Sequence, residues 1–151
     1  MLRPSKKMLF AIEAVLDIAY HAGGEPVQSR EITRRQGIPR RYLEQTLQQL
    51  VRSGILIGVR GPHGGYRLAR ERRRVSVGEI VRVVRALEAA EETEEDLPSS
   101  DLGRDVIRPM WTVLQEDIMV RLDGISIDDL CMKAYQSGII SEVTQKMDFT
   151  I

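Results

Sequence analysis

The chain is short of cysteine, of long apolar runs and of net charge. Cys131 is the only cysteine among 151 residues, so no internal disulfide can form, and we expect a cytoplasmic protein. No run approaches the roughly 18 apolar residues of a membrane span, and residues 1–7 lack the apolar core of a secretory signal. Because 22 Lys and Arg balance 22 Asp and Glu, the chain is not a uniformly basic nucleic-acid coat protein.

The balanced total hides an uneven distribution of charge. Residues 30–74 carry twelve Arg, no Lys and three Glu, a net charge of +9, whereas residues 75–151 have a net charge of −9. The planar fork of donors on arginine matches phosphate groups and guanine edges. The all-arginine block therefore favours nucleic-acid recognition, and the alternative is a solvated basic face that touches nothing.

Apolar spacing and helix-capping signals predict three helices in the first third of the chain. We expect helices over residues 6–22, over 30–36 with Ser29 as the N-cap, and from about Pro39 to Ser53. In the third helix, the apolar stripe consists of Leu43, Leu47 and Leu50. At about 100° per residue, the opposite face centres on four polar residues: Arg41, Gln45, Gln48 and Arg52.

The period of the pattern then changes from helical spacing to alternation. Residues 55–60 alternate in the manner of a strand, residues 61–65 form a glycine-rich loop, and residues 66–69 predict a second short strand. A fourth helix is expected over residues 76–90. Three helices followed by a glycine-tipped hairpin are the order of a winged helix-turn-helix.

An acidic linker and an apolar segment make up the rest of the chain. Residues 88–105 contain eight acidic residues and no cysteine. The apolar segment begins at Val106, and Pro109 either starts its helix or kinks it. The spacing of Ser126 and Asp129 is that of a capping box, which predicts one more helix, to about residue 136.

The polar face of the third helix is the candidate reading surface. If the helix buries its leucines, that face is free to enter the major groove of DNA. There Arg41 can donate twice to guanine, Gln45 and Gln48 can pair with adenine, and Glu44 can accept from cytosine. The full set of expected DNA contacts, with phosphate and wing contacts included, is Lys6, Lys7, Ser29, Arg40, Arg41, Tyr42, Glu44, Gln45, Gln48, Arg52, Arg60, Pro62, His63, Gly64 and Gly65.

Four segments of the chain resemble the Rrf family of bacterial winged-helix transcription regulators. They are PVQSREI at 26–32, YLEQ followed by Leu47, VRGP-x-GGYRLAR at 59–70 and VGEIV at 77–81. The glycine-rich turn, preceded at this distance by Tyr-Leu-Glu-Gln, makes the resemblance specific over roughly residues 6–85. The resemblance implies a mainly α fold, with a winged helix-turn-helix domain and a long C-terminal dimerisation helix.

The resemblance also implies a homodimer on a near-palindromic duplex, and a division of the chain into three parts. We expect a DNA-binding domain over residues 1–87, an acidic linker over 88–105 and a helical dimerisation region over 106–151. The expected dimer contacts are Val106, Met110, Trp111, Val113, Leu114, Ile118 and Leu122.

The chain departs from the iron–sulfur members of this family at the positions of the cluster ligands. Those members place three cysteines before the dimerisation helix, where residues 88–105 have none. Arg108 occupies the position of the histidine ligand, and Leu9 the position of an aspartate ligand that some members use. Because thiolates normally hold such clusters, we expect no cluster, no metal and no other cofactor.

Two other interpretations of the sequence stay open beside a DNA-binding repressor. The first is a protein-interaction module regulated by a metabolic enzyme partner, and the second is a sensor with a non-standard metal or cluster site. A small-molecule effector is compatible with all three. No paired carboxylates or nucleophile motif points to catalysis, so we do not expect an enzyme.

Overall fold

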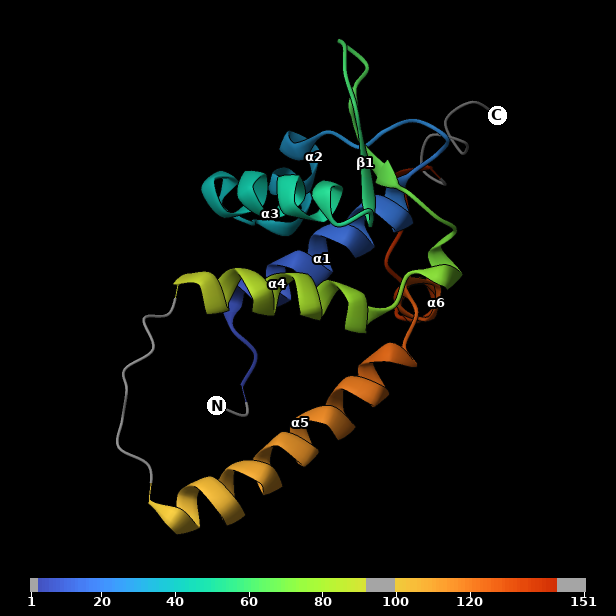
Figure 1. Ribbon diagram of the computed structural model, residues 1–151. Coiled ribbons are helices and arrows are strands. Elements are labelled where there is room, and N and C mark those ends of the chain that lie inside the picture. The colour runs from blue at the N-terminus through green and yellow to red at the C-terminus, as the bar shows by residue number, and fades with distance from the viewer. Residues whose placement is uncertain (1–2, 92–99, 144–151) are drawn as a thin grey trace.

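The computed structural model describes residues 3–91 and 100–143, and these residues are mostly helical (Figure 1). The mainly α class and the winged helix expected from the sequence are confirmed. In chain order the elements are α1 (Lys6–His21), α2 (Ser29–Gln36), α3 (Arg40–Arg52), β1 (Leu56–Val59), β2 (Gly65–Leu68), the 3-10 turn η1 (Arg72–Arg74), α4 (Val77–Glu91), the π-helical turn η2 (Gly103–Ile107), α5 (Arg108–Asp123) and α6 (Ile127–Gln136).

Helix α1 runs through the centre of the fold and contacts α2, α3, α4 and α6. Its buried face carries small side chains, Ala11 and Ala14, beside Val15 and Ile18, so that the neighbouring helices approach closely. The leucines of α3, Leu43, Leu47 and Leu50, are buried against this core as the sequence predicted. The polar side of α3 is consequently directed away from the core.

The hairpin of β1 and β2 forms the wing, in which Leu56 pairs with Leu68 and Val59 with Gly65. Val27 adds a single bridge to Tyr66, with both N–H to O distances at 2.8 Å. The bridge requires glycine at position 65, where φ is +152° and a Cβ would lie 2.5 Å from the Val27 carbonyl oxygen. The wing is thereby attached to the segment that leads into α2.

Two expected helix boundaries need correction. Ser29 is the first residue of α2 and not its N-cap, because Gln28 holds that position and its backbone N–H donates to Glu31 at 2.8 Å. The predicted linker at 88–105 is helical at both described ends, since α4 continues to Glu91 and helix resumes at Asp101. Its central part, residues 92–99, lies outside the described residues.

The structure also decides the role of Pro109. This residue lies at the start of α5, directly after the π-helical turn η2. Proline lacks an N–H and its ring clashes with the carbonyl four residues earlier, and the wider π turn accommodates both effects. Downstream, the capping box at Ser126 and Asp129 is confirmed, with N–H to O distances of 2.9 and 3.0 Å.

Helix α5 is attached to the rest of the fold mainly at its C-terminal end (Figure 1). There both carboxylate oxygens of Asp123 accept from Arg82 of α4, at 2.6 and 2.7 Å, and the Asp123 side chain packs where Gly78 leaves room. No residue of α5 is buried. Such an apolar helix with no buried residue is typical of an element that packs against a further partner.

Candidate nucleic-acid interface

The polar face of α3 is exposed along its whole length. Arg41, Gln45, Gln48 and Arg52 are all exposed, as the helical spacing predicted. The guanidinium of Arg41 lies 5.5 Å from the centre of the Tyr42 ring, which restricts the arginine by a cation–π contact. The structure thus presents the expected reading residues on one solvent-facing side of the helix.

Two of the α3 residues expected to contact DNA, Arg40 and Glu44, form an ion pair with each other. The Arg40 Nε donates to Glu44 Oε1 at 2.9 Å, an exposed i,i+4 ion pair. Exposed pairs of this kind contribute only about 0.3–0.5 kcal/mol, so DNA phosphates can compete for the arginine. The Glu44 carboxylate is therefore already engaged by Arg40, and its expected contact with cytosine stays a prediction.

A groove of about 960 Å³ lies between the wing, the first turn of α2 and the start of α3. The first N–H groups of a helix have no intrahelical acceptor, and the helix dipole adds positive potential there, so both helix starts favour an anion. Ser29, Arg60 and Pro62, all expected contacts, line this groove. The sequence reasoning missed Arg30 and Thr33, which line it too; the position of Arg30 beside the α2 cap was the available signal.

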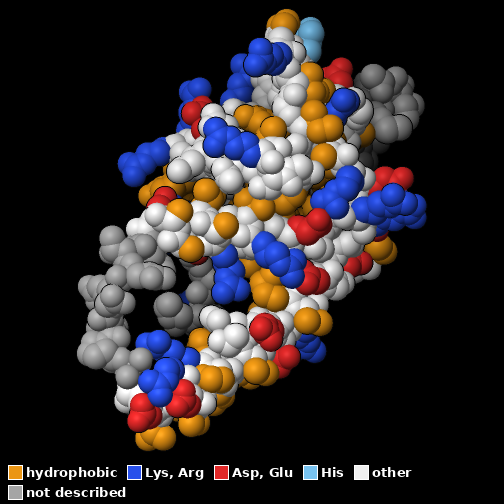
Figure 2. Space-filling model, in the orientation of Figure 1, with side chains coloured by type: hydrophobic (Ala, Val, Ile, Leu, Met, Phe, Trp, Pro, Cys, Tyr) orange, Lys and Arg blue, Asp and Glu red, His pale blue; other side chains and the backbone are white. Residues whose placement is uncertain are grey.

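Half of the arginine block already pairs with carboxylates of the same chain among the described residues. Six of its twelve arginines form ion pairs within the chain: Arg34, Arg35, Arg40, Arg70, Arg72 and Arg73. The other six have no carboxylate partner among residues 3–91 and 100–143, and they are Arg30, Arg41, Arg52, Arg60, Arg67 and Arg74. Most of these lie on α2, α3 and the wing, where Figure 2 shows Lys and Arg gathered with few acidic side chains among them.

Some of the wing-loop residues expected to contact DNA are exposed, and others make contacts within the wing. Arg60, Pro62 and His63 are exposed, and Gln28 donates to the Pro62 carbonyl at 3.4 Å. Gly64 is buried, its N–H donates to Gly61 at 2.9 Å, and a Cβ there would lie 2.2 Å from the Val59 carbonyl oxygen. Gly64 therefore has a packing role inside the wing, and its expected contact with DNA stays a prediction.

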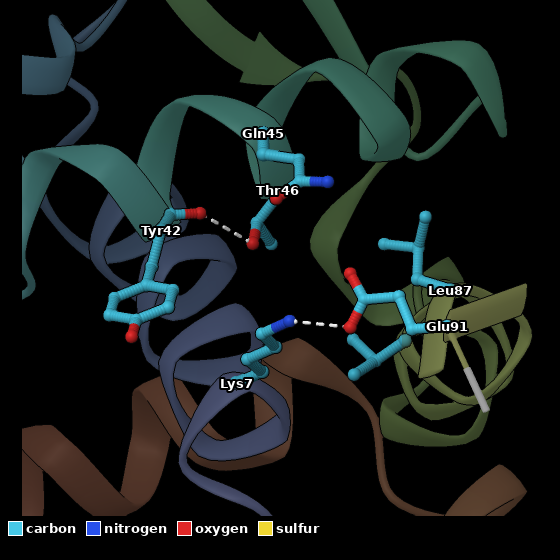
Figure 3. A pocket seen from close by; sticks show the side chains of 7 residues that line it. Lys7, Tyr42, Gln45, Thr46, Leu87 and Glu91 are labelled. Carbon is cyan, nitrogen blue, oxygen red and sulfur yellow. Dashed lines mark hydrogen bonds and ion pairs between the residues drawn. The ribbon is translucent and has the colours of Figure 1, made fainter. Parts of the chain in front are cut away.

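The N-terminal lysines differ in their surroundings. Lys6 is exposed, whereas Lys7 donates to Glu91 at 2.9 Å, so α4 competes with any phosphate for it (Figure 3). Tyr42 and Gln45 of α3 line a small cavity beside this pair. At about 10 Å³, the cavity offers no more than the space of one water molecule, and it cannot hold an effector.

A buried carboxylate fixes α2 to α1. Asp17 is fully buried and accepts three hydrogen bonds of 2.8 to 2.9 Å, two from Arg35 and one from Gln36. Arg35 also pairs with Glu142 at 2.8 Å, and Arg34 reaches the same carboxylate at 2.8 Å. The arginines on this side of α2 thus fix its position below the groove, which is a role that the charge count alone did not suggest.

His21 takes part in this attachment and gives stability a pH dependence. Its Nδ1 accepts from the backbone N–H of Glu142 at 3.1 Å, which requires an unprotonated nitrogen. Burial and then the charge of Arg35 hold the pKa of His21 below its ordinary value of 6.5, against the opposing charges of Asp17 and Glu142. Between the lowered pKa of the folded chain and the ordinary pKa, the unfolded chain binds more protons on His21 than the folded chain does. We therefore expect stability to fall as the pH falls below about 7.

The variant His21→Gln tests this expectation, because glutamine keeps an acceptor and does not titrate. Urea unfolding at several pH values should give a shallower fall in stability for His21→Gln than for the wild type. Burial opposes ionisation of Glu142 and Glu79, but the pKa of each is held below 4.5, by Arg35 and Arg34 for Glu142 and by the Ser76 backbone N–H and Arg70 for Glu79. Both therefore stay ionised in this window. Identical slopes for the two proteins would contradict a role for His21.

The comparisons with known proteins agree on one family. The Rrf2 profile, described as "Iron-dependent Transcriptional regulator", matches residues 4–133. The chain belongs to the Rrf2 family. It is 35% identical over 129 residues to the HTH-type transcriptional regulator IscR of Xenorhabdus nematophila, a match that covers 85% of this chain and 79% of that protein. It is also 32% identical over 149 residues to IscR of Vibrio cholerae, with 97% and 83% covered.

Solved structures of this family have the same fold. T. potens IscR is similar with a TM-score of 0.72 and 32% identity, over 92% of this chain and 93% of that one. CymR, the global cysteine regulator of B. subtilis, is similar with a TM-score of 0.68 and 26% identity, over 88% and 98%. As a member of this family, the chain is a DNA-binding transcription regulator. None of its described helices has the length and hydropathy that a membrane span requires.

The donor set of this Rrf2 chain does not fit an iron–sulfur cluster, although the family is described as iron-dependent. Clusters are held by several thiolates, and this sequence contains one cysteine. Cys131 is buried on α6, and burial raises the pKa of its thiol. Among residues 3–91 and 100–143, no three His, Cys, Asp or Glu side chains are grouped to hold a metal.

Proposed function

We propose that this Rrf2 regulator is a sequence-specific repressor that binds a near-palindromic operator as a homodimer. The observation that carries the proposal is a groove lined by the wing and by the starts of α2 and α3, next to a helix α3 whose polar face is exposed. The groove contains Arg30 and Arg60, which have no carboxylate partner among the described residues. This arrangement suits a DNA strand, because the phosphates have partners on the groove walls while α3 reaches the base edges.

Each part of the interface has a separate task in this mechanism. Arg30 and Arg60, with the helix starts, bind phosphates and set the register of the protein on the duplex. Arg41, Gln45 and Gln48 then meet base edges in the major groove. Repression follows if the bound dimer occupies the DNA that RNA polymerase needs.

Dimerisation is supported by the surface of α5. Six of the seven expected contact residues, Val106 on η2 and five on α5, are exposed in the single chain, with residue exposures between 43% and 55%. Leu122 is half-buried. Figure 2 shows hydrophobic side chains running along this helix. An apolar surface of this extent is typical of a protein interface. A second copy would bury it and place two α3 helices on successive turns of one duplex.

The variant Arg41→Ala tests the reading role of α3. We expect it to weaken operator binding by about 1–3 kcal/mol and to relax the preference for one base pair in each half-site. Fluorescence anisotropy with the operator and with random DNA at the same salt concentration measures both effects. An equal loss on the two DNAs would show that Arg41 contacts only the backbone.

The matched control is Arg74→Ala. Arg74 is also exposed and without a carboxylate partner among the described residues, but it lies on η1 and not on α3 or the groove. We expect this variant to bind the operator like the wild type. A loss equal to that of Arg41→Ala would assign the effect to total charge and not to the interface.

A further inference from the structure

Two charged side chains, Asp117 and Arg121, interrupt the exposed apolar face of α5. Both are exposed, and a separation of four residues puts them about 40° apart around the helix axis. Neither forms an ion pair with any residue among 3–91 and 100–143. They are therefore available to charges outside the chain.

The pair lies within the apolar surface and not at its border. Around the helix and along it, the neighbouring side chains are apolar and roughly half exposed or more: Val113, Leu114, Ile118 and Val120. Asp123, which binds Arg82 of α4, is about 120° from Asp117 and about 160° from Arg121 around the axis. The two charges thus point away from the side of α5 that contacts its own fold.

A surface that buries these apolar residues must also bury the two charges. A charge that loses its hydration without gaining an opposite partner is costly, and interface cores are depleted of charged residues for that reason. Burying an aspartate and an arginine in one apolar interface costs little free energy only where each side chain meets an opposite charge. A second copy of the same helix supplies both.

We propose that Asp117 of one protomer pairs with the partner's Arg121, and that the two reciprocal pairs fix the orientation and register of the α5 helices. A two-fold interface repeats every contact, so one such pair requires the other. Antiparallel helices that cross between residues 117 and 121 bring opposite charges together twice. Parallel helices would bring like charges together. The inference rests on the proposed homodimer and adds its geometry.

Two full-length variants, D117R and R121D, test the pairing. Each places like charges opposite each other in its own homodimer, and we expect each homodimer to dissociate at a concentration at least about tenfold higher than the wild type. A mixture of D117R with R121D restores opposite charges at both places. Sedimentation velocity on the mixture should therefore give a heterodimer about as stable as the wild-type dimer, and the double variant D117R/R121D should recover as a homodimer.

A control and two outcomes keep this inference separate from the homodimer itself. The variant E116R has the same change of charge on the adjacent exposed residue, about 100° around the helix from Asp117, and it should dimerise like the wild type. A monomeric wild type would overturn the proposed homodimer and with it the pairing. A dimeric wild type with equally dimeric D117R and R121D, and no preference in the mixture, would overturn the pairing alone.

Discussion

Replacing Asp17 by alanine is expected to lower the free energy of unfolding by about 3–5 kcal/mol, because a buried ion pair then loses one partner. Arg35 is nearly buried, with 10% of its side chain exposed, and would keep only Glu142 as a counter-charge. Gln36 would also lose its acceptor. Urea unfolding at a fixed protein concentration measures the change, since the stability of a dimer depends on concentration.

Two further variants show how much of the stability loss comes from the charge of Asp17, how much from its volume and how much from the neighbouring carboxylate. Asp17→Asn keeps the volume and one acceptor, so we expect a loss smaller than that of Asp17→Ala. Glu142→Ala removes the outer carboxylate, which is 24% exposed, and should cost no more than about 1 kcal/mol. If Asp17→Ala were as mild as Glu142→Ala, the buried contact would not be what holds α2 in place.

Replacing Leu114 by glutamate is expected to dissociate the dimer. Operator binding should then weaken by roughly 10²–10⁴-fold, because this is the gain in affinity that a dimer obtains from linking two DNA-binding domains. Leu114 is 47% exposed in the single chain, so the winged helix should still fold. Affinity for a duplex with one half-site should stay at the wild-type value. Sedimentation velocity and anisotropy with one-site and two-site duplexes measure these quantities.

A position on the polar side of the same helix provides the matched control for this experiment. Thr112→Glu introduces the same side chain two residues earlier, about 160° around the helix from Leu114. This variant should dimerise and bind the two-site duplex like the wild type. Unchanged dimerisation in Leu114→Glu would mean that the α5 surface is not the subunit interface.

The local pattern of the sequence predicted the elements of the winged helix because local contacts define them. The spacing of Leu43, Leu47 and Leu50 decided which side of α3 is buried, and period-two alternation predicted the wing. The Ser126 capping box was predictable for the same reason. The similar box at Ser76 and Glu79, with N–H to O distances of 2.9 and 3.2 Å, was missed although its Ser-x-x-Glu spacing was visible.

The candidate site was harder to predict, because its electrostatics depend on contacts between distant residues. Arg35 pairs with Asp17 and with Glu142, which lies more than a hundred residues later, and Arg72 pairs with Asp128. A charge count over residues 30–74 cannot separate these structural arginines from Arg30 and the other unpaired ones. Pro109 was compatible with a helix start and with a kink, and only the structure shows the π turn that precedes it.

Selection of genomic DNA fragments by the purified wild-type protein tests the central claim most directly. At a stated salt concentration, the enriched fragments should share a near-palindrome whose half-sites are centred about 10–10.5 base pairs apart, or a multiple of that distance. The Arg41→Ala protein should enrich that sequence poorly or lose one base preference in each half. Fragments without a shared sequence, captured equally by both proteins, would contradict sequence-specific recognition by α3.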